Sequence, residues 1–352
     1  MTFSHRAVLT AGLFVVAGCG GGGGVGTSTL PAQSGLRAPQ IAVMSPSPVP
    51  TPSPTPLPGK PVGTIYAAVT DRVYALDLAG VGTTTAQRTI IPHPNQTQIL
   101  EGVATSADGT LDILEDYFPT PSSQSVCRVV VETPTADGPA IAVGTHLCDP
   151  VNTGQGEGIA RNTVGGYDVL YTDTTLSKDI VHRYGSDGAS LVSTLVLDFF
   201  PLYLANDRAG HEFLDTSGGR IVLYKGTTQD PTIRNSDVTL VGNPQLGPIA
   251  VSPGADRTVY VVEGPLGNQN IYALAPGSNV ILRTIGPFTK RYISALAVDS
   301  HSNLYAGTDR TDNALYASIQ VFDSTANGTP APTRIIVPSP ATNYIRGLAI
   351  FE

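Results

Sequence analysis

Three features that mark many enzymes and nucleic-acid-binding proteins are missing from this sequence. Its 20 Lys and Arg residues are outnumbered by 28 Asp and Glu residues and form no basic cluster, which argues against a nucleic-acid partner. It contains neither G-x-S-x-G nor H-E-x-x-H, so the serine-hydrolase elbow and the zinc-protease motif are excluded. No amphipathic helical pattern stands out. Short runs rich in Val, Ile, Thr and Tyr, separated by Gly, Asp, Asn and Pro, predict an all-β fold.

Cysteine is scarce, and the first of the three cysteines has a special position. Residues 1–18 have the pattern of a signal peptide, because His5 and Arg6 precede an apolar run too short to span a bilayer. The run ends in Val16-Ala17-Gly18-Cys19, which resembles the bacterial lipobox, whose Cys is lipidated and becomes the new N-terminus. An ordinary secretory signal with a chance Cys is the alternative. Lipid chains on Cys19 would anchor the protein to a membrane.

The other two cysteines, Cys127 and Cys148, are expected to form a disulfide bond. An exported protein folds in an oxidising compartment, where a remaining pair tends to become oxidised. The two residues flank a predicted hairpin of residues 126–132 and 140–147, whose antiparallel pairing would bring them together. Two free, buried thiols are the alternative.

A tether is predicted over residues 19–62, between the signal peptide and the body at 63–352. Its start, 20–26, is rich in glycine, and alternating Ser/Thr-Pro at 45–61 favours an extended polyproline II spacer. Because Gly20 is not the acidic residue that retains lipoproteins at the inner membrane, a Gram-negative cell would carry the protein on its outer membrane. The body would then lie in the periplasm or at the cell surface.

The body contains an internal repeat. In each repeat an apolar residue precedes an alanine, and successive alanines are 56, 45, 45, 47 and 52 residues apart, as in four-stranded blades. A small residue suits an inner strand, because inner strands converge on a central channel. The pattern predicts a six-bladed β-propeller with four antiparallel strands per blade. The six alanines are Ala104, Ala160, Ala205, Ala250, Ala297 and Ala349.

The two ends of the body predict how the ring closes. The last repeat, 347–352, stops after one strand, whereas the body begins at 64–67 with what reads as a second strand. We therefore expect the C-terminal inner strand to pair with the N-terminal strands. Such pairing joins the ring and hides a strand edge, which fits a monomeric body.

Residues 247–352 resemble the blade consensus of NHL-repeat and YncE-like bacterial propellers. The resemblance is carried by 295–300 with 303–305, by 319–322 and by 332–335. It implies the propeller fold and leaves the function open, because such motifs specify a fold better than an activity. The absence of Trp argues against WD40 blades and against tryptophan-docked quinoproteins.

Propeller geometry brings two sets of residues to one end of the channel, which we call the channel mouth. Acids there would attract cations or basic partners, and their oxygens suit Ca²⁺ or another divalent cation. The alternative is that these acids cap tight turns. The first set starts the inner strands and comprises Glu101, Glu157, Leu202, Gly247, Ser294 and Arg346. The second set ends the second strands and comprises Asp71, Asp116, Asp173, Asp215, Glu263 and Asp309.

Glu101 and Glu157, each followed by Gly, resemble the channel-mouth Glu-Gly of the gluconolactonase family of six-bladed propellers. This resemblance implies a divalent metal site and a metal-dependent lactonase or related hydrolase. The chain departs from the family, because the other inner-strand starts lack the Asn or Asp ligands and Arg346 adds a positive charge. An ion pair between Arg346 and Glu101 is the alternative.

The leading hypothesis is a non-enzymatic binding or scaffold propeller at the cell envelope. It rests on the lipid anchor, the long spacer and the missing catalytic motifs. Its ligand would be a protein, a peptide or a glycan, and the sequence does not distinguish among them.

Overall fold

The computed structural model describes residues 63–352, except 95, 121–122, 140–141, 150–153, 217–219, 226–227, 235–245, 266, 276–277, 279, 290 and 311–315. Cys19 and the predicted segments 1–18 and 19–62 lie outside these residues. The described residues form strands and turns. Among these residues there is no helix with the length and apolar character needed to cross a membrane.

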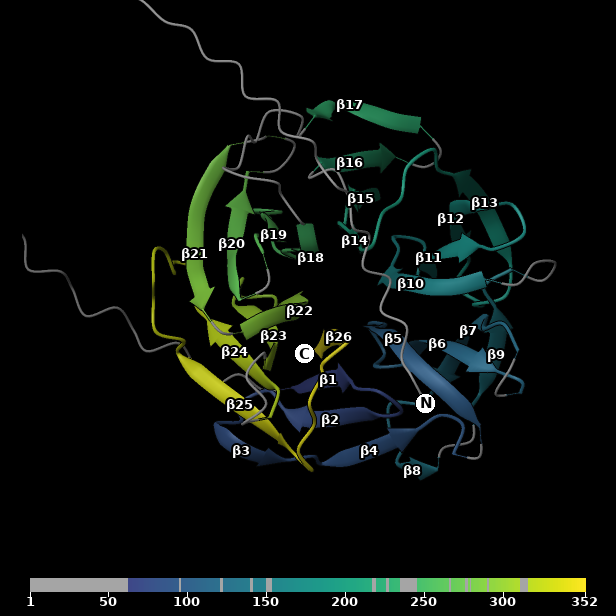
Figure 1. The fold of residues 1–352 in the computed structure, drawn as a ribbon, viewed down its shortest axis with the longest axis horizontal. Coiled ribbons are helices and arrows are strands. Elements are labelled where there is room, and N and C mark those ends of the chain that lie inside the picture. Colours follow the sequence, from purple (N-terminus) through teal and green to yellow (C-terminus); the bar gives the residue numbers. More distant parts are fainter. Residues whose placement is uncertain are drawn as a thin grey trace, which may run out of the picture. The chain divides into compact units, whose positions relative to one another are not determined.

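Six sheets are arranged in a ring around a central axis, and neighbouring strands within each blade are antiparallel (Figure 1). From the channel outward, blade 1 consists of β26 (Gly347–Phe351), β1 (Thr64–Ala68), β2 (Val73–Asp77) and β4 (Arg88–Ile91). Blade 2 consists of β5 (Thr97–Thr105), β6 (Leu111–Phe118), β7 (Val126–Glu132) and β9 (Gly144–Leu147). Blade 3 consists of β10 (Gly154–Arg161), β11 (Tyr167–Asp173), β12 (Lys178–Tyr184) and β13 (Leu191–Val196).

The remaining three blades follow in chain order. Blade 4 consists of β14 (Leu204–Asn206), β15 (His211–Thr216), β16 (Arg220–Lys225) and β17 (Thr228–Arg234). Blade 5 consists of β18 (Leu246–Val251), β19 (Val259–Glu263), β20 (Asn268–Leu274) and β21 (Ile281–Thr289). Blade 6 consists of β22 (Arg291–Val298), β23 (Leu304–Arg310), β24 (Ser318–Phe322) and β25 (Arg334–Ser339).

The burial patterns explain why the strands differ in sequence. Second and third strands such as β19 and β24 are buried along their whole length, because a neighbouring blade covers each face, and they are therefore continuous apolar runs. Outermost strands such as β13 alternate between exposed and half-buried residues. The core consequently lies between blades, as where Ile65 and Leu76 of blade 1 share a cluster with Tyr305 and Ile319 of blade 6.

The predicted repeat and ring closure are confirmed. All six alanines of the repeat lie in inner strands. β1 pairs on one side with β2 and on the other with β26, where Tyr66 faces Ala349. The C-terminal strand therefore completes the blade that the first strands of the body begin, and the six-bladed prediction holds.

The prediction of four antiparallel strands per blade is confirmed, and two of the sheets contain in addition a short fifth strand that comes from the neighbouring blade. β3 (Gly82–Thr85) of blade 1 pairs in parallel with β25, and β8 (Gly138–Pro139) of blade 2 pairs in parallel with β4. A similar bridge joins Gly328 to Ile285. In each case the connection between the third and fourth strands of one blade reaches back to the outermost strand of the preceding blade.

An arginine on the outermost strand fastens this connection. Arg88 donates hydrogen bonds to the hydroxyl of Tyr66 at 2.9 Å and to the carbonyls of Pro134 and Ala136 in the connection from blade 2. Its guanidinium also lies 5.7 Å from the centre of the Tyr66 ring. Tyr–Arg pairs at equivalent positions in blades 5 and 6 are Tyr260–Arg283 and Tyr305–Arg334.

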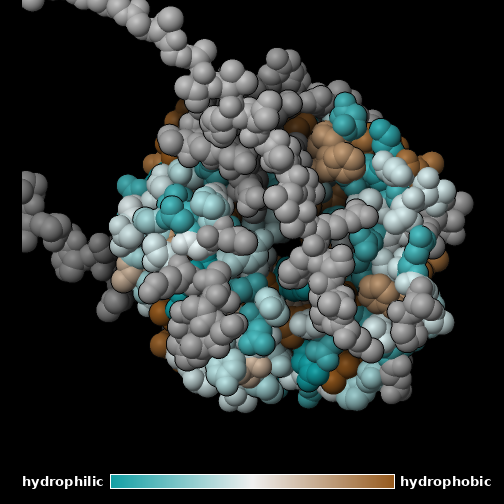
Figure 2. Space-filling model, viewed as in Figure 1, coloured by the Kyte–Doolittle hydropathy of each residue, from teal (hydrophilic) through white to brown (hydrophobic). Residues whose placement is uncertain are grey.

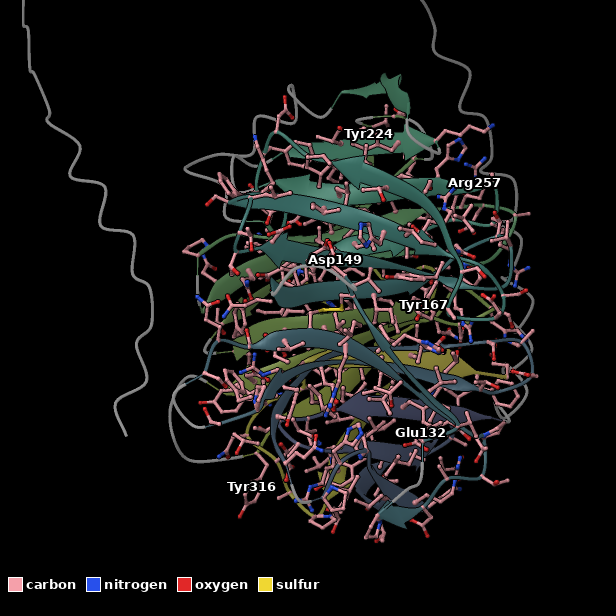
Figure 3. All side chains as sticks on the ribbon, turned by 90° about the vertical axis from the view of Figure 1, so that its right-hand side faces the viewer. Glu132, Asp149, Tyr167, Tyr224, Arg257 and Tyr316 are labelled. Atoms are coloured by element: carbon pink, nitrogen blue, oxygen red, sulfur yellow. A yellow bond between two sulfur atoms is a disulfide. The ribbon has the colours of Figure 1, made fainter. Side chains whose placement is uncertain are left out.

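The predicted disulfide bond is confirmed and joins β7 to the residue that follows β9 (Figure 3). The Cα atoms of Cys127 and Cys148 are 5.4 Å apart, and both residues are buried. The main chain supports the same pairing, since the Cys148 N–H donates to the Cys127 carbonyl at 3.0 Å.

Replacing both cysteines with Ala should lower the free energy of unfolding by about 3 kcal/mol, because the bond closes a loop in the unfolded chain. Urea unfolding of the wild type and the double variant would measure the difference. Dithiothreitol should destabilise the wild type by a similar amount and leave the variant unchanged. An equal response of both proteins to the reductant would contradict the prediction.

Candidate functional site

The inner strands carry a β-bulge just inside the channel mouth. The pairing register shifts between Leu100 and Gly102, between Gly156 and Gly158, and between Ile293 and Ala295. A bulge adds one residue to a strand and re-aims a side chain. The extra residues are Glu101, Glu157 and Ser294. The three residues are therefore structurally equivalent, but the prediction that they start the inner strands is wrong, because β5, β10 and β22 begin three or four residues earlier.

Glu101 is engaged by a cation from the neighbouring blade. An Arg346 nitrogen lies 3.1 Å from a carboxylate oxygen of Glu101, and the Arg346 N–H donates to the Ala68 carbonyl at 2.8 Å. Burial raises the pKa of Glu101, although the charge of Arg346 opposes this. The ion pair between blades 1 and 2 is thus present, and it occupies one of the two carboxylates expected to bind a metal.

Glu157 is the less satisfied of the two glutamates. No described residue forms an ion pair with it, and the hydroxyl of Thr172 lies 3.5 Å from its Oε1. The same hydroxyl donates more closely to Asp179, at 2.5 Å. Burial, followed by the charges of Glu101 and Asp116, raises the pKa of Glu157 to about 8. At neutral pH this carboxyl group is therefore mostly protonated and can both donate and accept hydrogen bonds.

Three acids of the second strands hold the inner strands in place. Asp116 accepts a hydrogen bond from the N–H of Gly156 in the next blade at 2.8 Å. Asp309 accepts in the same way from Ile345 at 3.0 Å and also from the Ser294 hydroxyl. The third, Asp215, accepts from the N–H groups of Leu202 and Tyr203.

Two further acids are engaged within their own turns. Asp173 caps the turn after β11 by accepting from the N–H groups of Thr175 and Leu176. Asp71 pairs with the adjacent Arg72 at 2.7 Å. Asp173 therefore caps its turn, which is the alternative to metal binding that the sequence left open, and Asp71 is held by its neighbour. A metal role for either residue stays a prediction.

The buried acids carry less charge than the composition suggests. Burial raises the pKa of Asp116, Asp215 and Glu263 to about 7 and that of Asp309 to about 6. One oxygen of Glu263 and one of Asp215 have no hydrogen-bond partner among the described residues. With these pKa values, a substantial fraction of the carboxyl groups is protonated at neutral pH. The neutral form avoids the cost of burying an unpaired charge.

Two tyrosines complete the channel mouth, and the sequence reasoning missed both. The hydroxyls of Tyr203 in blade 4 and Tyr292 in blade 6 lie 3.4 Å apart. Burial, then the nearby Tyr292, raises the pKa of Tyr203 well above its usual value. A signal for Tyr203 existed, because it occupies a place in the repeat where the other blades have Gly, Pro or Ala.

One group of three potential metal ligands occurs among the described residues, and it lies away from the mouth. Ligand atoms of Asp299, His301 and Glu352 lie within 4.8 Å of one another. The Asp299 carboxylate already accepts hydrogen bonds from two N–H groups, from the Asn303 amide and from the Tyr305 hydroxyl. This group is therefore better described as a capped turn than as a metal centre.

The comparisons with known proteins bear on the fold. No family model and no curated protein matches the chain. A solved structure of a protein of unknown function from Bacteroides caccae superposes with a TM-score of 0.58 at 10% identity, covering 82% of this chain and 99% of that one. The shared fold is a β-propeller. At this identity the likeness shows the architecture of this propeller and nothing of its activity.

Two other solved structures match this propeller less closely. A protein from Lactobacillus plantarum has a TM-score of 0.46 at 15% identity, covering 82% of this chain and 99% of that one. A quinoprotein alcohol dehydrogenase-like protein from Bacteroides thetaiotaomicron has a TM-score of 0.42 at 13% identity, covering 78% and 77%.

Proposed function

We propose that this protein is a lipid-anchored, non-enzymatic binding propeller of the cell envelope, related to the NHL-repeat and YncE-like propellers. Its channel mouth would receive a protein, a peptide or a glycan. The observation that supports this role is a contrast between the strands and the channel mouth. The strands repeat from blade to blade, whereas the side chains at the mouth do not. Equivalent positions at the mouth carry side chains as different as Glu157, Ser294 and Arg346. Such variety suits recognition, because a few placed polar groups give a binding site its specificity.

The geometry favours binding over metal-dependent hydrolysis. A hydrolase of that kind needs a metal-activated water and a base. Arg346 already neutralises Glu101, and the described residues at the mouth provide no group of three ligands. Glu157 alone would be a weak site for Ca²⁺, which takes six to eight oxygen ligands.

The anchor is tested by fractionation of cells that express the full chain. We expect the wild type in the membrane fraction and Cys19→Ser in the soluble fraction. The reason is that Ser at position 19 cannot carry the acyl chains that would anchor the protein. Labelled palmitate should enter the wild type alone. Membrane association of Cys19→Ser would contradict the anchor without touching the binding role.

The binding role is tested by cross-linking in envelope preparations and by glycan arrays. A ligand of the mouth should be captured by the wild type and lost in Glu157→Gln and Arg346→Gln. Asp323→Asn, which alters an exposed turn of blade 6, is the control and should retain it. Equal capture by all variants would show that the mouth is not the site.

Metal ions should not change the thermal midpoint of the full chain, because the mouth lacks a complete ligand set. The measurement is an unfolding curve in EDTA and then in Ca²⁺, Mg²⁺ or Zn²⁺, since a ligand of the native state raises the midpoint. A rise that disappears in Glu157→Gln would place a metal at the mouth and restore the hydrolase alternative.

A further inference from the structure

A second candidate site lies at the end of the channel opposite the mouth. A cavity of about 1310 Å³ opens there, where the inner strands end and turn into the second strands. All six blades contribute to its lining, among them Ser106, Asn162, Asp207, Pro253, Asp299 and Glu352. Pockets for drug-sized ligands are commonly about 300–1,000 Å³. The cavity is therefore large enough for a short segment of peptide.

The cavity is not symmetric, because it continues into a groove between blades 2 and 3. Val131, Val143 and His146 line the blade 2 side of this groove, and Tyr167 and Gly188 line the blade 3 side. Tyr167 is fixed by a hydrogen bond from its hydroxyl to the Gly188 carbonyl at 2.6 Å. Val143 is 63% exposed, so the groove presents an apolar surface to solvent.

Two permanent negative charges lie in the same groove. Hydrogen bonds from Ser106 and Thr110 lower the pKa of Asp108 to about 2. Hydrogen bonds from Ser190 likewise hold the pKa of Asp187 below its usual value. Both side chains are therefore ionised at any physiological pH, and no described residue forms an ion pair with either of them.

The arginine beside them is already neutralised. Arg161 lies 2.7 Å from the buried carboxylate of Asp112 and donates to the Gly165 carbonyl at 2.8 Å. Its charge balances Asp112 and also helps to lower the pKa of Asp108, so a single arginine lies near two carboxylates while Asp187 adds a further negative charge. The groove consequently has a net negative charge beside an apolar surface.

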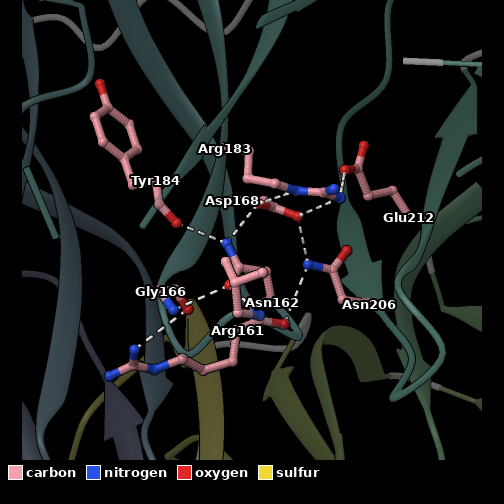
Figure 4. Close-up of polar contacts among 9 residues, drawn as sticks. Arg161, Asn162, Gly166, Asp168, Arg183, Tyr184, Asn206 and Glu212 are labelled. Atoms are coloured by element: carbon pink, nitrogen blue, oxygen red, sulfur yellow. Dashed lines mark hydrogen bonds and ion pairs between the residues drawn. The ribbon is translucent and has the colours of Figure 1, made fainter. Parts of the chain in front are cut away.

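The wall of the cavity is rigidly organised (Figure 4). Asn206 donates to the main-chain carbonyl of Arg161 at 3.1 Å and to Asp168 at 2.7 Å. Asn162 and Arg183 reach the same buried Asp168 from the other side. These hydrogen bonds hold Asn162 and Asn206 in place at the wall of the cavity, and a site that is formed in advance binds at a lower entropic cost.

We propose that this cavity and groove bind a basic peptide segment. Positive side chains would lie against Asp108 and Asp187, and an apolar side chain between them would pack on Val131 and Val143. Complementary charge argues for this occupant over an acidic peptide or a nucleic acid. The two aspartates belong to turns of different blades and to no group of metal ligands, which argues against a single bound ion.

Fluorescence anisotropy of the full chain tests the proposal. The probe is a labelled, capped peptide of alternating Lys and Val, compared with the same peptide carrying Glu in place of Lys. We expect the basic peptide to bind and the acidic one not to bind. Asp108→Asn with Asp187→Asn should weaken binding at least about tenfold, because Asn preserves the turn caps while removing both charges.

A matched control separates the site from overall charge. Asp77→Asn with Asp323→Asn also removes two turn-capping charges, but these residues are outside the cavity. Binding should be unchanged in this control. Equal weakening by both double variants, binding of the acidic peptide, or no binding of the basic one would overturn the proposal. None of these outcomes bears on the channel mouth.

Discussion

Gly347→Ala should lower the free energy of unfolding by about 1–3 kcal/mol, although it adds a single methyl group. An added Cβ at Gly347 would lie 2.9 Å from the Gly102 Cα and 3.1 Å from the Val103 nitrogen. Both are main-chain atoms of β5, so no side chain can move aside. The clash falls where β26 closes the ring against blade 2. Urea unfolding followed by far-ultraviolet circular dichroism would measure the loss.

The same position in other blades provides graded controls. A Cβ at Gly158 would lie 3.4 Å from the nearest atom, which is ordinary contact, so Gly158→Ala should be almost neutral. Gly102→Ala should fall between the two, because its nearest contact, at 3.0 Å, is a methyl group of Ile159 that can shift. Blade 6 already has Ala295 at this place. Equal stability of Gly347→Ala and Gly158→Ala would show that the closing strand is not packed tightly.

Stability should fall as the pH rises from 5 to 8.5, by at least about 2 kcal/mol. The pKa values of Asp116, Asp215, Glu263 and Glu157 are raised by burial to about 7 or 8. Between pH 4 and 8 the folded chain therefore binds more protons than the unfolded chain. These groups contribute fully below their unfolded pKa, and the contribution is lost as the pH rises through the folded pKa. His93, whose pKa burial lowers, acts in the opposite direction.

Denaturant unfolding across this pH range would measure the slope. Glu263→Gln should flatten the slope, because burial alone raises the pKa of Glu263. Asp323→Asn should leave it unchanged, since hydrogen bonds from Thr325 lower the pKa of Asp323 and it stays ionised throughout. A wild-type stability that is constant or rises from pH 5 to 8.5 would contradict the prediction.

The blade repeat, the ring closure and the disulfide bond could be predicted from the sequence, because each leaves a local pattern of residues. Alanine recurs in inner strands because the channel limits side-chain size, and that spacing gave the number of blades. The ends of the body predicted the pairing of Tyr66 with Ala349, because an unfinished first blade and an extra last strand complement each other. The pairing of Cys127 with Cys148 was predictable from their hairpin and from the expectation that an exported protein folds under oxidising conditions.

Features that depend on partners distant in sequence were missed. β3 has the sequence Gly-Thr-Thr-Thr and no buried residue, so its pairing with β25 arises from main-chain atoms that carry no side-chain signal. The cavity opposite the mouth is lined by separate turns of six blades, and each turn alone resembles an ordinary capped turn. For the acids at the mouth, the residue types alone did not distinguish metal ligands from residues that cap turns.

The surface also differs from what composition suggests. On the face in Figure 2, brown, apolar residues are visible along the outer rim. Leu147 of β9, Leu191 of β13 and Leu282 of β21 are each at least 45% exposed. These strands have no further blade to cover their outer side, which explains apolar residues that a sequence pattern would assign to the core.

The shared closing blade also sets an order of events during synthesis. β1 and β2 leave the ribosome first, yet the inner partner of β1 is β26, the last strand to appear. Until then β1 keeps an unpaired edge, and pairing of such distant segments is slow. The newly made chain is therefore most open to edge-to-edge aggregation just before the five-residue strand β26 appears. A stalled or truncated chain would remain in that state, with blades 2 to 6 able to form while blade 1 stays incomplete.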